Sequence, residues 1–259
     1  MKEVNDVKDK SKKKKKGDPN LLIKFTILIF LLVSCVIAYF VCSNMPSFNV
    51  KKINAAATKH YTEKQILQAI DINTNVNIFK IDVAKIQKNI LKLPYVKKVV
   101  INKFFPKTLD ITIVEKKEKY KVLNNKTNKI VLIDELGYVL EETDKYDLKP
   151  SDYLIRGITL DELIPGEKLN QVVVYQLEAA QKIVDEYNSQ IKSRKATSIV
   201  FAGNAITLVI DEKLNVLLPS SSDKLEYTIR FLNKILNEIT PSTVFIDMTK
   251  DNPYSQEIN

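Results

Sequence analysis

The chain has 259 residues, 45% of them hydrophobic and 27% charged, with 40 Lys and Arg against 31 Asp and Glu and a formal net charge of +9. This composition is typical of a globular protein with one large or two small domains. The sequence has five glycines and one histidine, His60, and neither GxGxxG nor GxxxxGK[ST] occurs. We therefore expect no nucleotide-binding loop and no multi-histidine metal site. No cofactor and no small-molecule substrate is assigned.

Residues 1–24 form a basic tail, with nine Lys against four Asp and Glu, a net of 9 − 4 = +5. The lysine run from Lys12 to Lys16 is similar to a nucleic-acid-binding patch. No arginine or aromatic residue is interleaved with these lysines, however, so no nucleic-acid partner is expected. The tail is better explained by the segment that follows it.

Residues 25–43, FTILIFLLVSCVIAYFVCS, contain no charged side chain. As a helix they would extend about 28 Å, close to the hydrocarbon thickness of a bilayer. Lysines crowd the N-terminal side of this run, whereas residues 44–49 contain none. The pattern predicts one transmembrane helix, with residues 1–24 in the cytoplasm and the C-terminal part outside the membrane.

Two alternatives apply to the apolar run. A cleaved signal peptide would have a shorter apolar core and a small-x-small exit, which this run lacks. A lipoprotein signal fits Leu32-Val33-Ser34-Cys35, with Cys35 as the acylated residue, but residues 36–41 continue the apolar run beyond that cysteine. Cys35 and the chain's other cysteine, Cys42, both lie in the run, so no disulfide framework is expected in the rest of the chain.

Residues 48–116 have a readable order of elements. An extended stretch is expected at residues 48–54, and the capping box of Thr62 and Gln65 predicts a helix that runs to about Ile70. Asp82 is placed to cap a second helix, which ends before Pro94.

Two strands are predicted after these helices, at residues 96–104 and 108–115, joined by a turn at residues 105–107. Ile111 and Ile113 alternate with polar residues, so they are expected to face the helices through Ile86 and Ile90. The order of elements is β-α-α-β-β.

The remainder alternates strands with two longer helices. Strands are predicted at residues 120–123, 130–133, 139–140, 153–157, 199–201, 205–210, 215–218 and 244–248, and helices at residues 169–187 and 223–239. The fold class is therefore α+β, with a single N-terminal transmembrane helix, a β-α-α-β-β domain, and a mixed β-rich domain with two helices.

The residues of the first domain resemble those of the POTRA domain in the bacterial cell division family FtsQ/DivIB. The resemblance is carried by Asn77-Ile78-Phe79, Pro94-Tyr95-Val96 and the run from Pro106 to Glu115, and it continues into the hairpin at residues 132–140 and the strand Ile246-Asp247-Met248. It implies a POTRA-like domain at residues 45–116, an FtsQ/DivIB-type β-domain at 117–250 and a C-terminal tail at 251–259.

The resemblance implies a non-enzymatic scaffold of the division machinery. Such a protein would bind FtsL-like and FtsB/DivIC-like bitopic proteins outside the membrane, help control septal peptidoglycan synthesis, and be enriched at the septum. A POTRA-bearing transport component is an alternative, as is a cell-wall hydrolase using Asp134-Glu135 and Glu141-Glu142. Adjacent carboxylates and a lone histidine are more typical of surface positions, so no catalytic or metal-binding residue is assigned.

The partner-binding prediction concerns the strand at residues 244–248, which is expected to be the last strand and to lie at the sheet edge. The family resemblance implies that this edge receives FtsB/DivIC by strand addition. The residues assigned to binding are Phe245, Ile246, Asp247, Met248, Thr249 and Lys250, with Tyr254 as an aromatic anchor. A proline at Thr249 should then remove a ladder donor. The alternative is a central strand whose side chains lie in the core.

Overall fold

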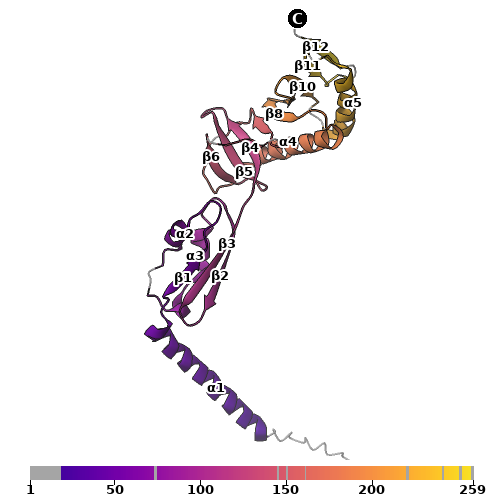
Figure 1. Ribbon diagram of the computed structural model, residues 1–259. Helices are drawn as coiled ribbons and strands as arrows, with labels where there is room; N and C mark the ends of the chain where they lie inside the picture. Colours follow the sequence, from indigo (N-terminus) through magenta and orange to yellow (C-terminus); the bar gives the residue numbers. More distant parts are fainter. Residues whose placement is uncertain are drawn as a thin grey trace, which may run out of the picture. The chain divides into compact units, whose positions relative to one another are not determined.

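The structure is a computed structural model that describes residues 19–72, 75–144, 146–149, 151–160, 162–219, 222–240, 242–250 and 253–257. The fold is α+β, as predicted, with an apolar N-terminal helix followed by two sheets and their helices (Figure 1). The chain divides into two compact units. One consists of Met1–Asn54, Ile72–Asp82 and Asn102–Asp110, and the other of Ala55–Asp71, Val83–Ile101 and Ile111–Asn259.

The apolar run forms helix α1, Pro19–Asn44. Its segment Leu22–Asn44 is long and apolar enough to cross a membrane, and none of its most apolar window is buried. The helix passes through Cys35 without a break. It begins earlier than predicted, so residues 19–24 of the expected tail are helical, whereas residues 1–18 lie outside the described residues.

The next elements confirm the predicted β-α-α-β-β order. They are β1 (Lys52–Ala55), α2 (Glu63–Ile70), α3 (Val83–Ile90), β2 (Val96–Phe104) and β3 (Thr108–Glu115), with short 3-10 helices at Pro46–Phe48 and Ile78–Lys80. The sheet order is β1-β3-β2. The capping box is present, because the Gln65 amide donates to Thr62 Oγ1 and the Thr62 amide donates to Gln65 Oε1.

Burial in β3 follows the predicted alternation only in part. Ile111 is buried, as are Ile86 and Ile90 on α3. Ile113, expected on the same face, is only half-buried. Ile111 is therefore the member of this pair that contributes a full core side chain.

The second sheet contains nine strands among the described residues, in the order β12-β11-β10-β9-β8-β7-β4-β5-β6. Their bounds are β4 Glu118–Asn124, β5 Lys129–Asp134, β6 Val139–Thr143, β7 Leu154–Arg156, β8 Ala196–Ala202, β9 Ala205–Ile210, β10 Leu214–Leu218, β11 Thr243–Asp247 and β12 Tyr254–Glu257. Three neighbouring pairs are parallel, namely β4 with β7, β7 with β8, and β10 with β11. Each predicted strand of this region is present, and β12 is additional.

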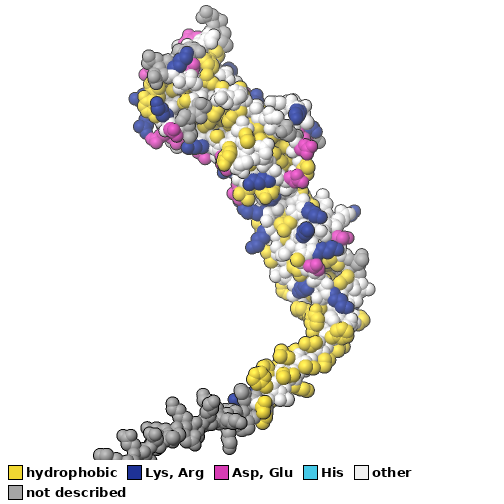
Figure 2. Space-filling view, turned by 180° about the vertical axis from the view of Figure 1, so that it is seen from behind, with side chains coloured by type: hydrophobic (Ala, Val, Ile, Leu, Met, Phe, Trp, Pro, Cys, Tyr) yellow, Lys and Arg dark blue, Asp and Glu magenta, His cyan; other side chains and the backbone are white. Residues whose placement is uncertain are grey.

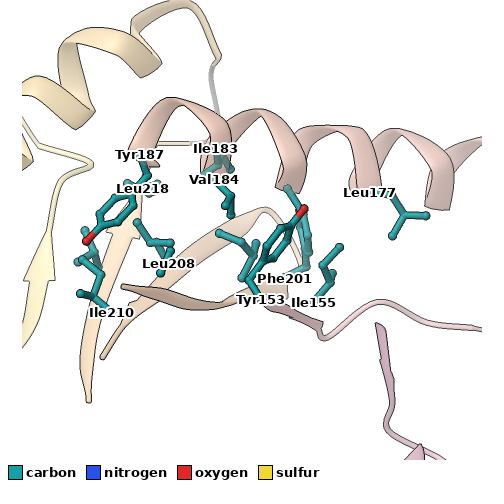
Figure 3. Packing of buried hydrophobic residues seen from close by; sticks show 14 of the residues in the cluster. Tyr153, Ile155, Leu177, Ile183, Val184, Tyr187, Phe201, Leu208, Ile210 and Leu218 are labelled. Carbon is teal, nitrogen blue, oxygen red and sulfur yellow. The ribbon is translucent and has the colours of Figure 1, made fainter. Parts of the chain in front are cut away.

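Two helices pack on this sheet, α4 (Gln171–Gln190) and α5 (Leu225–Glu238). In Figure 3, side chains of α4 point toward the strands, with Tyr187 beside Leu208 and Ile210. Tyr187 is fully buried and its hydroxyl donates to the carbonyl of Arg194 at 3.2 Å. The helices thus bury their apolar faces on the sheet, and the sheet edges remain as the places where backbone groups lack strand neighbours.

Candidate partner-binding edge

The strand predicted to be the last one is not at the edge of the sheet. β11 pairs with β10 in parallel, with Phe245 opposite Asn215, and on its other side it pairs with β12 in antiparallel register, with Ile246 opposite Ser255 (Figure 1). The expectation that no later strand pairs beyond β11 is therefore wrong. β12 is the outermost strand, and part of the expected C-terminal tail belongs to the sheet.

The residues assigned to partner binding fall into different environments. Ile246, which is fully buried, and Met248 belong to the hydrophobic core, as the central-strand alternative expected. Phe245 is half-buried, whereas Thr249 and Lys250 are exposed just after the strand. Tyr254 begins β12, opposite Asp247. The buried pair is unavailable to a partner, so any docking surface must use the exposed residues and the backbone of β12.

Asp247 at the end of β11 is hydrogen-bonded to Thr249, two residues further along the chain. Its Oδ1 accepts hydrogen bonds from the Thr249 hydroxyl at 2.6 Å and from the Thr249 amide at 2.9 Å. The hydroxyl bond lowers the pKa of Asp247 and outweighs the opposing effect of burial. Because the Thr249 amide bonds to this carboxylate, it is not a ladder donor, and the predicted effect of a proline at Thr249 is wrong.

The outer strand β12 exposes a polar surface. Ser255, Gln256 and Glu257 are all exposed. Glu257 Oε1 accepts a hydrogen bond from Thr240 Oγ1 at 2.7 Å, which ties the end of β12 to the segment after α5. Since β12 is outermost, alternate backbone N–H and C=O groups along it point away from β11, where an added strand would bind.

Sequence reasoning missed β12 because its residues, Tyr-Ser-Gln-Glu, lack the apolar alternation that predicts a strand. One signal was available. Asn252-Pro253 is a turn dipeptide between the apolar strand and this short segment, as expected between two antiparallel strands. The position of β12 in the sheet is what makes these polar residues candidate site residues.

Three of the four carboxylates considered for catalysis are used in local structure. Asp134 Oδ1 accepts the amides of Leu136 and Tyr138, each at 2.9 Å, within the β5–β6 turn. Glu135 pairs with Lys97 at 2.8 Å, and Glu142 accepts hydrogen bonds from Asn124 and Thr127. Among the described residues, no group of three or more His, Cys, Asp or Glu could hold a metal ion.

His60 is less exposed than a surface histidine. Its ring stacks on Tyr95 with centroids 3.7 Å apart, and its Nδ1 lies 3.0 Å from Glu115 Oε2. Burial acts to raise the pKa of Glu115, but hydrogen bonds from Thr58 and from the amide of His60 hold it below its usual value. Thr58, His60 and Glu115 thus connect the segment before α2 to the end of β3, and we interpret their contacts as structural.

Comparison with known proteins shows which proteins this chain is similar to. The protein family described as "POTRA domain, FtsQ-type" matches residues 48–116. The cell division protein DivIB of Bacillus anthracis is 28% identical over 172 residues, covering 66% of this chain and 60% of that protein. DivIB of Clostridium tetani is 32% identical over 114 residues, covering 44% and 42%, and FtsQ of Syntrophotalea carbinolica is 25% identical over 146 residues, covering 55% and 48%. The chain thus spans about 40 to 60% of the length of these three relatives.

Proposed function

We propose that this chain is a member of the FtsQ/DivIB family of bacterial cell division proteins, because its residues 48–116 match the FtsQ-type POTRA domain and it is similar to DivIB proteins. In this proposal it is a non-enzymatic scaffold that spans the membrane once and binds small bitopic division proteins outside it. The partners are FtsB/DivIC-like and FtsL-like proteins, and through them the scaffold influences septal peptidoglycan synthesis. The position of β12 at the outer edge of the nine-stranded sheet is the observation that carries this proposal.

Strand addition at β12 is the proposed mode of binding. An extended segment of the FtsB/DivIC-like partner pairs with the outward N–H and C=O groups of Ser255 and its neighbours. The exposed residues Thr249 and Lys250, next to the end of β11, supply side-chain contacts at the rim. The buried Ile246 and Met248 act only by holding β11 in the core beneath this edge.

Proline substitutions on β12 test this mode of binding. Successive N–H groups point to opposite sides of a strand. Of the two variants Ser255→Pro and Gln256→Pro, one therefore removes an N–H that points toward β11 (the inward substitution), and the other removes an N–H that points toward the partner (the outward substitution). We expect the outward substitution to raise the Kd for the FtsB/DivIC-like partner by about tenfold or more with an unchanged melting temperature, because it removes a hydrogen bond and a strand contact. The inward substitution should lower the melting temperature.

The measurement is co-purification of the partner with the full chain from detergent-solubilised membranes, followed by a titration. Ser255→Ala and Gln256→Ala are matched controls, because both keep the backbone N–H. Strand addition at this edge would be overturned if both proline variants bind the partner as tightly as the unchanged chain, including the one with an unchanged melting temperature.

The topology is tested separately. The uncharged α1 and the lysines before it favour a cytoplasmic N-terminus and a C-terminal part outside the membrane. Protease added to cells stripped of their wall should therefore digest the C-terminal part and leave an N-terminal tag intact. Palmitate labelling that disappears in Cys35→Ala would contradict the uncleaved span and support a lipoprotein.

A further inference from the structure

The C-terminal end of α1 is hydrogen-bonded to the 3-10 helix at Ile78–Lys80 and to Asn77, the residue before it. Asn77, only 6% exposed, donates from Nδ2 to the carbonyls of Cys42 and Met45, at 3.1 Å each. Lys80 Nζ donates to Asn44 Oδ1 at 2.9 Å. Of these acceptors, the Cys42 carbonyl lies in the last turn of α1, where a helix leaves carbonyls without an i+4 amide partner. Hydrogen bonds therefore hold the C-terminal end of α1 against the segment Asn77–Lys80 of the same unit.

A chain of aromatic rings runs from α1 to the turn between β2 and β3. The Phe79 ring lies 5.8 Å from that of Tyr39 on α1, 5.3 Å from Phe48 and 5.1 Å from Phe105, between ring centroids. In Figure 2 the hydrophobic surface of α1 continues past the end of the helix. Phe104 and Phe105 of the turn are each 57% exposed, which is unusual for two adjacent large aromatic side chains.

The depth of these rings follows from the helix. Tyr39 lies four residues before Ser43, which with Asn44 ends the apolar run, and four residues extend about 6 Å along a helix axis. When α1 spans a bilayer, Tyr39 lies at the outer boundary of the hydrocarbon. Phe79 contacts Tyr39 and Phe105 contacts Phe79, so the turn lies two ring contacts from Tyr39 and close to this boundary.

The charges near the turn fit a lipid surface. Lys103 and Lys107 flank the two phenylalanines in the sequence Lys-Phe-Phe-Pro-Lys, and residues 102–109 include no acidic residue. Lys103 is half-buried, with its Nζ donating to the carbonyl of Ile81 at 3.0 Å. Aromatic side chains flanked by lysines are typical of segments that lie in a membrane interface containing anionic lipids.

We propose that the turn Phe104–Lys107 is a second membrane contact, in which Phe104 and Phe105 insert into the outer leaflet beside α1 and the flanking lysines lie among anionic headgroups. The contact fixes the first unit on the bilayer surface. The proposal rests on the single span of the proposed function and is independent of any division partner.

Single tryptophans test the contact, because the chain contains none. The full chain is reconstituted in vesicles of equimolar phosphatidylcholine and phosphatidylglycerol, with lipids brominated either near the carbonyls or near the chain ends. The Phe104→Trp variant reports on the turn. Phe30→Trp, in the middle of the apolar run, reports on the span, and Tyr227→Trp, on α5 and 66% exposed before substitution, is the control in the other unit.

We expect the emission maximum of Phe104→Trp to lie at a shorter wavelength than that of Tyr227→Trp. Its intensity should fall when the lipids are replaced by lipids brominated near the carbonyls. Phe30→Trp should be quenched most by bromines near the chain ends, and Tyr227→Trp by neither. If Phe30→Trp is quenched but Phe104→Trp emits like Tyr227→Trp, the contact is overturned and the span stands. An unquenched Phe30→Trp overturns both the span and the contact that depends on it.

Discussion

Gly157→Ala is expected to be among the most destabilising single changes in the β-rich region. Gly157 follows β7 with a φ of +77°, and a Cβ at this position would lie 1.9 Å from the carbonyl oxygen of Phe201. The left-handed backbone costs about 1–2 kcal/mol for alanine. The overlap of the new Cβ with the Phe201 carbonyl oxygen of β8 costs about 1–3 kcal/mol more. The sum is a loss of about 2–5 kcal/mol, a large part of a typical domain's stability.

Gly203→Ala is the matched control. Gly203 also has a positive φ, +60°, but a Cβ there would meet no heavy atom within 4 Å. It should therefore lose only the backbone cost, about 1–2 kcal/mol. Urea unfolding of the full chain in detergent, followed by circular dichroism, measures both variants. Equal midpoints for the two variants would show that β7 and β8 are not packed this closely at Gly157.

Ile111→Ala is expected to lower the free energy of unfolding by about 2–4 kcal/mol, because it removes a fully packed side chain and leaves a cavity. Ile111 is 3% exposed in β3, and Ile86 and Ile90 of α3 are 2% and 0% exposed. The same unfolding measurement applies to this variant.

Ile113→Ala is the control on the same strand, since Ile113 is only half-buried and loses less buried surface. Its loss should be clearly smaller than that of Ile111→Ala. A loss below about 0.5 kcal/mol for Ile111→Ala, within the range of ordinary surface substitutions, would mean that the facing of β3 is misassigned.

Local chemistry is what made much of this fold predictable from the sequence. The apolar run of α1, the capping box at Thr62 and the alternation around Ile111 each depend on residues a few positions apart. Such signals are already complete within one helix or strand, which is why the element order and the bounds of β2 and β3 agree with the prediction. The family resemblance rests on the same local segments.

The candidate site depended on tertiary structure. β12 is a strand because its backbone pairs with β11, and its four residues carry no apolar pattern that would predict this. The addition of β12 moves the free edge away from β11 and leaves Ile246 in the core.

The sequence by itself determined the apolar span and the order of elements up to β11, because each is encoded in contiguous residues. Only the tertiary structure decided which strand is outermost, how closely Gly157 approaches Phe201, and that Phe79 joins Tyr39 of α1 to Phe105. These features join residues that lie tens of positions apart in the chain. Backbone pairing and side-chain packing between distant segments, which no local pattern specifies, bring them together.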